Sequence, residues 1–341
     1  MATERIMMAH GSGGSMTKAL IDEVFLPAFG QDASTQGDDS FTAVLESAPA
    51  HLVLSTDTFV VTPRFFPGGD IGRLAVCGTV NDVATSGACV LYLSCGFVIE
   101  EGLPLDDLRA VVCSMAAAAR EAGVAIVTGD TKVVERGGCD GLYINTTGVG
   151  VIERGTALSG RDCRPGDKVL LSGTLGDHGV AVMACREGLG LVTTVESDVA
   201  PLNGLVSAVL REAPHVRCFR DPTRGGLAST LNELAVQSAV AIEVEEALIP
   251  VKDQVRGCCD LLGLDVLQVA NEGKMVCIVP EDEAGAALAA MRTSRYGENA
   301  AIIGEVLERP AAAMPPVTVR TELGTRRIMD MPVGEQLPRI C

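Results

Sequence analysis

The chain has 341 residues, and its 27 basic and 44 acidic side chains give a formal net charge of −17 and a pI near 4.7. This balance argues against nucleic acid or an anionic membrane as a partner. Mean hydropathy is +0.30, yet no apolar run reaches the roughly 18 residues that a membrane span needs. The length predicts about two domains.

The cysteines point to a reducing compartment. Twelve are present, mostly dispersed singly in apolar segments, and with only four histidines and no CxxC pair a zinc site is not expected. The first residues, 1–6, lack the basic and apolar regions of a signal peptide. We therefore expect free thiols and a cytoplasmic protein.

In chain order, the first half begins with a lead-in over 1–40 and an α/β domain over 41–155. Apolar spacing predicts a strand over 51–61, helices over 72–86 and 105–122, and strands over 124–128 and 141–152. Gly123 provides the stop signal of the second helix.

A Gly-, Arg- and Pro-rich stretch over 153–166 predicts the boundary to a second domain over 165–327, followed by a flexible tail over 328–341. The last 25 residues as a whole are expected to be irregular. The second domain is expected to contain strands over 168–172, 240–245, 274–279 and 300–306, and helices over 180–187, 224–237 and 282–294. Thr223 is the predicted N-cap of the helix over 224–237. The fold class is therefore α+β (mixed α/β), with a mixed sheet packed on helices in each domain.

Acidic residues stand in Gly-, Thr- and Asn-rich surroundings, while the nucleotide signatures GxxxxGK[ST] and GxGxxG are missing. The acids are Asp38, Asp57, Asp82, Asp130 and Asp221. Each alone also fits a turn or a helix cap. Together they indicate a site where Mg²⁺ screens a polyphosphate, because Mg²⁺ prefers carboxylate oxygens and bridges to phosphates.

Three further segments could carry chemistry. The loop 10–14 (HGSGG) could surround phosphates with backbone amides, although a disordered start has the same composition. If the segment around them is extended, Glu272 and Lys274 lie on the same side of it. On their own, an exposed ion pair is the simpler interpretation of these two residues. Cys341 is the last residue, and on its own it fits an inert thiol better than a reactive one.

These segments form an ordered series: HGSGG, GDDS, FPGGDIG, GTVNDVA, GDTKVV, INTTG, GDHG, RDPTRGGLA, ANEGK and PRIC. The series resembles the HypE family of hydrogenase maturation proteins, in the superfamily of aminoimidazole ribonucleotide synthetase and selenophosphate synthetase. The resemblance covers nearly the whole chain and implies a two-domain PurM-like architecture whose first domain binds ATP.

The resemblance also implies an activity. In this family HypF places a carboxamide on the C-terminal cysteine, here Cys341, and ATP-dependent dehydration turns it into a thiocyanate. The cyanide then passes to iron on the HypC–HypD complex and becomes a ligand of the [NiFe]-hydrogenase site. The implied cofactors are ATP and Mg²⁺, and the implied assembly is a homodimer.

Site residues carry over by motif. The implied metal ligands are Asp38, Asp57, Asp82 and Asp221. The implied nucleotide contacts are Asp57, Asp82, Gly129, Asp130, Thr131 and Asn145. The implied catalytic residues are Cys341, Lys132, Glu272, His10 and Arg224, with Lys132 on phosphate or the activated carboxamide and Glu272 as general base oriented by Lys274.

Two alternatives stay open at this point. A small-molecule synthetase of the same superfamily would need no terminal thiol, but its selenophosphate form expects a reactive group near the N-terminus, and the first cysteine is Cys77. An interaction scaffold would use the thiol for docking and bind no ATP. The tail could serve the leading hypothesis, because the 14 residues from Ile328 to Cys341 span roughly 45–50 Å when extended.

Overall fold

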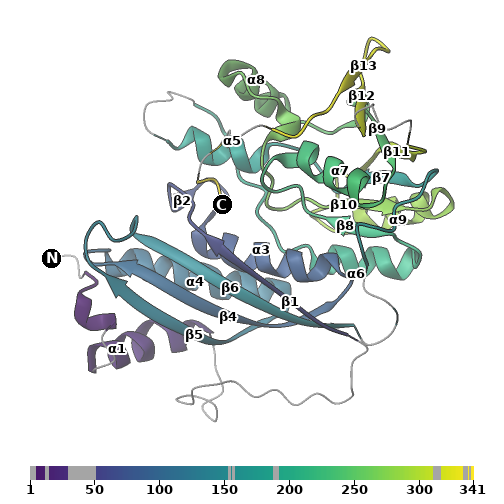
Figure 1. Cartoon of the computed structure of the whole chain (residues 1–341). Helices are drawn as coiled ribbons and strands as arrows, with labels where there is room; N and C mark the ends of the chain where they lie inside the picture. The colour runs from purple at the N-terminus through teal and green to yellow at the C-terminus, as the bar shows by residue number, and fades with distance from the viewer. Residues whose placement is uncertain are drawn as a thin grey trace.

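The computed structural model describes residues 5–11, 15–29, 51–152, 155, 158–186, 192–309, 316–332, 337 and 339–341. Its first unit is a four-stranded mixed sheet with helices along one face (Figure 1). The strand order is β1 (His51–Phe59), β6 (Leu142–Ile152), β4 (Cys89–Glu100) and β5 (Ala125–Val134), and the helices are α3 (Ile71–Thr85) and α4 (Leu105–Ala122).

Local chemistry fixes α3 against this sheet. The Asp70 carboxylate caps the helix by accepting the backbone N–H groups of Gly72 at 2.7 Å and Arg73 at 3.1 Å. A Cβ at Gly78 would lie 2.9 Å from the Phe59 ring of β1, so glycine allows a close approach of helix and strand. One turn further along, this packing brings Asp82 over β1.

The second unit is a seven-stranded sheet in the order β13-β12-β9-β11-β7-β10-β8, antiparallel except for the pair β9 and β12. Its strands are β7 (Lys168–Leu171), β8 (Cys218–Arg220), β9 (Ala241–Glu245), β10 (Val276–Val279), β11 (Ala301–Leu307), β12 (Val317–Arg320) and β13 (Arg326–Ile328). Its helices are α5 (Asp177–Ala184), α6 (Asn203–Glu212), α7 (Gly226–Gln237), α8 (Asp253–Leu262) and α9 (Ala284–Arg292). The predicted α+β class, with a mixed sheet in each unit, is confirmed.

Short elements complete the chain. Before the first sheet they are η1 (Met8–Gly11), α1 (Ser15–Leu20), the π-helical turn η2 (Ile21–Phe25) and α2 (Leu26–Phe29). Later they are the hairpin strands β2 (Phe65–Phe66) and β3 (Gly69–Asp70), and the turns η4 (Glu246–Leu248), η5 (Val266–Gln268) and η6 (Glu281–Glu283). Within the described ranges, no helix combines the length and apolar character that crossing a bilayer requires.

Buried hydrogen bonds join the two units. Asn81 of α3 donates to the Ala200 carbonyl at 3.0 Å, and its own side-chain oxygen accepts the Leu202 N–H at 2.7 Å. The Arg73 Nε donates to the Val199 carbonyl at 2.9 Å. Because a fully bonded buried amide tolerates little displacement, this contact fixes α3 relative to the segment 192–202.

The structure corrects three expectations. Thr223 is not an N-cap: α7 begins at Gly226 with Gly225 as its N-cap, the φ values of Gly225 and Gly226 are 76° and 58°, and at Gly226 a Cβ would meet the Val269 carbonyl at 2.6 Å. The strand expected over 124–128 continues to Val134. The last 25 residues are not wholly irregular, because β12 and β13 lie there.

Candidate active site

The described end of the chain is docked between the two units, beside the segment that follows β1 (Figure 1). The Cys341 carbonyl accepts the Val60 N–H at 3.3 Å, and the Arg339 carbonyl accepts the Thr62 N–H at 3.1 Å. Between them, the Ile340 side chain is 3% exposed and its carbonyl lies 2.8 Å from His178 Nε2. The tail therefore holds Cys341 at a defined place.

Burial raises the pKa of the Cys341 thiol well above its usual range, and the nearby Glu272 carboxylate raises it further by repulsion and a hydrogen bond. Arg224 opposes the shift and Asp57 adds to it. The thiol thus lies beside the carboxyl group that the motifs identify as the base.

Glu272 is buried, and its Oε1 has no hydrogen-bond partner among the described residues. Its pKa is raised well above the ordinary value, first by burial and then by repulsion from Asp221, Asp198 and other acids. The Asp198 Oδ1 accepts the Glu272 N–H at 3.1 Å. A buried carboxyl group with a raised pKa and a free oxygen is suited to exchange a proton with a group beside it.

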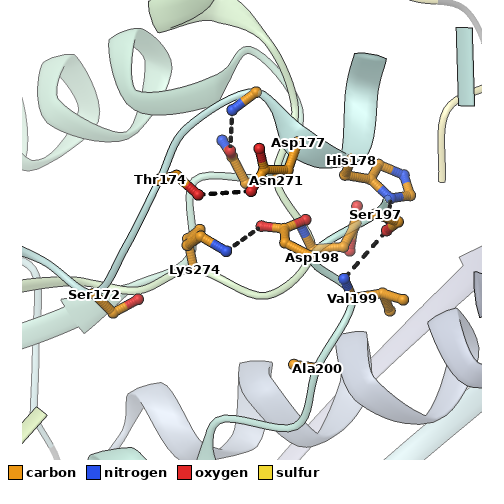
Figure 2. A network of polar contacts seen from close by, with 12 residues as sticks. Ser172, Thr174, Asp177, His178, Ser197, Asp198, Val199, Ala200, Asn271 and Lys274 are labelled. Atoms are coloured by element: carbon orange, nitrogen blue, oxygen red, sulfur yellow. Dashed lines mark hydrogen bonds and ion pairs between the residues drawn. The ribbon is translucent and has the colours of Figure 1, made fainter. Parts of the chain in front are cut away.

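The chain around Glu272 is tightly constrained. At Gly273 a Cβ would lie 1.7 Å from the Asp198 carbonyl, so only glycine fits there. Lys274 does not pair with Glu272 but with Asp198, at 3.0 Å (Figure 2). Lys274 therefore acts on the base through Asp198.

Three carboxylates from separate elements converge beside this base: Asp57 on β1, Asp82 on α3 and Asp221 after β8. Burial and repulsion from Asp57 raise the pKa of Asp82, although Ser55 Oγ donates to it at 2.9 Å. Burial and repulsion from Asp82 raise the pKa of Asp221 to about 7. Such mutual repulsion is the condition that a bound cation relieves.

These carboxylates fit Mg²⁺ as partial ligands. No group of three or more His, Cys, Asp or Glu side chains in the described part of the chain is close enough to hold a metal by itself. Mg²⁺ commonly takes only one or two carboxylates and completes its shell with water and substrate phosphates. The donor set therefore suits a metal held jointly with a polyphosphate; Asp38, the fourth expected ligand, lies outside the described residues.

Asn145 belongs to the same region. It lies on β6 opposite Thr58 of β1, and its side-chain amide donates to the Asp57 carbonyl and to Thr58 Oγ1, both at 2.9 Å. These bonds fix the β1 backbone at Asp57.

The remaining expected residues lie on or beside β5, the far edge strand, three strands and about 14 Å from β1. Lys132 and Asp130 form an exposed ion pair at 3.0 Å, which lowers the pKa of Asp130, and the Thr131 N–H also donates to Asp130 at 2.9 Å. His10, in η1, packs near β5 and accepts the Met7 N–H at 2.9 Å. A Cβ at Gly129 would lie 2.3 Å from the Cys95 carbonyl, so strand packing accounts for this glycine.

The chain thus brings together Cys341, Glu272, Arg224, Asp57, Asp82 and Asp221. Asn145 reaches this group only through the Asp57 backbone, because its side chain lies with those of Thr56 and Thr58 on the other face of the sheet. The β5 residues lie apart from the group within one protomer. Sequence reasoning missed Asp198, Ser197 and His178, which Figure 2 shows around Lys274. The GDHG segment that contains His178 had been noted without a role. Asp198 lies in an irregular stretch with no glycine or strand pattern to mark it.

Two family models match the chain: the N-terminal domain of AIR synthase related proteins over residues 37–152, and their C-terminal domain over residues 164–314. The fold and site therefore define the class of two-domain, PurM-like proteins that the motifs predict.

Relatives narrow this class. Carbamoyl dehydratase HypE of Azotobacter vinelandii is 53% identical over 336 residues, 98% of this chain and 97% of that protein. A crystal structure of hydrogenase maturation protein HypE in complex with ATP matches with a TM-score of 0.93 at 50% identity, covering 98% of this chain and 99% of that one. A chain of a HypE–HypF complex matches at 49% identity and a TM-score of 0.79, covering 92% and 100%. The chain belongs to the HypE family of carbamoyl dehydratases.

Proposed function

We propose that the protein uses ATP to dehydrate an S-carboxamide carried on its own Cys341, giving a thiocyanate that supplies cyanide to the iron of a [NiFe]-hydrogenase. The carrying observation is the position of the Cys341 thiol, against the Glu272 carboxyl and beside the cluster of Asp57, Asp82 and Asp221. The family's ATP complex supports ATP as the co-substrate.

The chemistry follows from the poor leaving ability of a carboxamide oxygen. That oxygen attacks the γ-phosphorus of ATP and ADP departs; the activated oxygen then leaves as phosphate while the nitrogen loses its protons. The balance is R–S–C(O)NH₂ plus ATP giving R–S–C≡N, ADP and phosphate. Glu272 lies beside the sulfur that carries the group, and its raised pKa suits it to take a proton from the nitrogen.

Asp57, Asp82 and Asp221 would hold Mg²⁺ together with the nucleotide phosphates. The bound ion supplies neutralisation of the charge that develops on the transferred phosphoryl group. Asn145 keeps Asp57 in place through the β1 backbone. Arg224, exposed in the turn directly before α7 and close enough to affect the Cys341 thiol, adds positive charge near that thiol.

A homodimer would complete the site. The sheet face opposite α3 and α4 carries exposed Leu52 (57%) and Leu54 (61%), and no helix of the described ranges covers it (Figure 1). If two such faces pack together, Lys132 and Asp130 of one protomer can approach the nucleotide site of the other. The carbamoyl donor is proposed to be HypF, consistent with the related HypE–HypF complex, and the cyanide acceptor HypC–HypD.

The test follows the mass of the C-terminal peptide. The purified protein is incubated with a HypF-type donor, carbamoyl phosphate and Mg-ATP, then digested and weighed. We expect addition of one carboxamide to Cys341 and then loss of one water. Appearance of the dehydrated group in Cys341→Ala protein would refute the proposal, as would its absence in wild type that carries the carboxamide.

A further inference from the structure

The GDHG segment at residues 176–179 begins α5, and its histidine contacts the tail rather than the nucleotide region. His178 is fully buried, and its Nε2 lies 2.8 Å from the Ile340 carbonyl oxygen. A carbonyl can only accept a hydrogen bond, so Nε2 carries the proton. His178 therefore donates to the peptide bond that precedes Cys341.

The other ring nitrogen is fixed as an acceptor. Ser197 Oγ lies 2.8 Å from His178 Nδ1 and itself accepts the Val199 N–H at 3.1 Å (Figure 2). The Ser197 hydroxyl proton is thus directed at Nδ1. The Phe66 ring meets the imidazole edge-on, at 89° with centroids 5.4 Å apart. Ser197 and Phe66 therefore hold the imidazole in the tautomer and orientation that present Nε2–H to the Ile340 carbonyl.

A second donor and a shaped surface act beside it. Arg186, just after α5, donates from Nη2 to the Arg339 carbonyl at 2.9 Å and from Nε to the Thr62 carbonyl at 3.0 Å. At Gly179 a Cβ would lie 2.4 Å from Val269 Cγ1 and 3.1 Å from Leu337 Cδ1, so the bare glycine allows close packing on Val269 and leaves room for the tail side chain. We define His178, Gly179 and Arg186 as the tail dock.

We propose that His178 is a positioning residue that holds the C-terminal tail in the dehydration site by donating to the Ile340 carbonyl; the inference rests on the proposed function for its purpose. It recognises main chain and not sulfur. The same bond can therefore form whether Cys341 is free, carbamoylated or cyanated. Release of the tail to a partner then requires breaking hydrogen bonds to the tail backbone, not contacts with the group on the Cys341 sulfur.

The dock and the base share one support. Ser197 fixes His178, and the next residue, Asp198, accepts the Glu272 N–H at 3.1 Å and pairs with Lys274. Figure 2 shows these two side chains leaving the same short segment. A displacement of this segment would move the tail contact and the base together.

The test measures how often Cys341 leaves the dock. Full-length protein without ATP or partner is treated with iodoacetamide, and alkylation of Cys341 is timed by peptide mass spectrometry, with exposed Cys89 and Cys113 as internal references. We expect His178→Leu to raise the Cys341 rate about 10-fold, the effect of losing one buried hydrogen bond. His178→Gln, whose amide nitrogen can replace Nε2, should stay within about 3-fold of wild type.

Controls keep the test decisive. His215→Leu, at an exposed histidine, should leave the rate unchanged. If His178→Leu fails to fold, Ser197→Ala decides instead, because it removes the partner that fixes the tautomer; we expect about a 3-fold rise. A wild-type rate in a folded His178→Leu protein, or in Ser197→Ala when that variant decides, overturns the proposal. So does a Gln variant as fast as the Leu variant.

The readout also separates this proposal from the proposed function, because alkylation needs neither ATP nor a carbamoyl donor. If the wild-type protein never dehydrates its carboxamide, the proposed function is refuted, but the alkylation rate of Cys341 still tests the tail dock. If dehydration does occur, His178→Leu should slow the dehydration of protein that already carries the carboxamide by about 10-fold. His178→Gln should restore that rate.

Discussion

Acidic side chains lie at two places where the two units meet. At one place their neighbours are cations, and at the other their neighbours are mainly other acids. Glu121 of α4 faces Arg73 at 2.9 Å, with Arg295 and the Tyr296 hydroxyl on its other oxygen, and these partners lower its pKa to about 2. Asp221 and Glu272 form no ion pair among the described residues, and their pKa values are raised, although Arg220 partly opposes the shift at Asp221. The fold neutralises the first group internally and leaves the second for a ligand to neutralise.

The largest effect should come from Glu272→Gln. Removing a general base typically costs about 10²–10⁴-fold in rate, so dehydration of the loaded Cys341 should fall by that factor. The neutral amide also relieves repulsion with Asp221, so the melting temperature should not fall. Single-turnover mass spectrometry and calorimetry measure both; a variant with the wild-type rate would show that Glu272 is not the base.

Glu121→Gln should lower the stability of the protein and leave its dehydration rate unchanged. It leaves the half-buried Arg73 without its carboxylate, and we expect the free energy of unfolding to fall by about 1–3 kcal/mol, with dehydration of folded protein unchanged. Because the folded-state pKa of Glu121 is about 2 and the ordinary value is 4.5, its stabilisation is present above pH 4.5 and is lost as pH falls toward 2. Denaturant titrations across that range should show the two proteins converging.

Asp221→Asn should stabilise the protein in the absence of nucleotide. The folded-state pKa is about 7 against 3.8 for a free side chain, so the wild type loses stability as pH rises from about 4 to 7. After discounting for solvent, we expect the Asn variant to gain roughly 1–2 kcal/mol at pH 8 and little at pH 4. Mg-ATP should stabilise the variant less than wild type in thermal unfolding, and an equal shift would count against a metal role.

The smallest effect on stability should belong to the exposed pair on β5. Lys132→Ala removes the 3.0 Å bridge to Asp130, and exposed bridges contribute about 0–1 kcal/mol. We expect a change in unfolding free energy below about 0.5 kcal/mol by urea titration. A larger loss would mean that this pair supports the fold, unlike a residue reserved for ligand contact.

The sequence predicted the class of fold because periodicity and turn chemistry are local. The 105–122 helix matches α4, and Gly123 ends it with φ of 72°. The strand β4 and the helices α6 and α8 were not predicted, although their sequences carry a local signal: apolar and aromatic residues run through β4, and both helices are amphipathic. Thr223 was misjudged because the helix start is shifted to Gly226, a left-handed glycine that packs directly against the 267–269 backbone.

The site divides in the same way. Motifs could identify Asp57, Asp82, Asp221 and Glu272 as chemically suited, but their meeting depends on Gly78 pressing α3 onto β1 and on Asn81 joining the units. His178 and Asp198 act through tertiary contacts with segments about 160 and 74 residues away. No local pattern contains such contacts.

The attachment of the tail after β13 sets the kinetics of the whole cycle. A substrate joined by a short flexible linker meets its site at an effective concentration of roughly millimolar, whatever the amount of protein. For the proposed reaction, dehydration at saturating ATP would be first order in the loaded protein, and saturation would apply to ATP but not to the carboxamide. Turnover would then depend on the time the tail spends in the site, which a few backbone hydrogen bonds set.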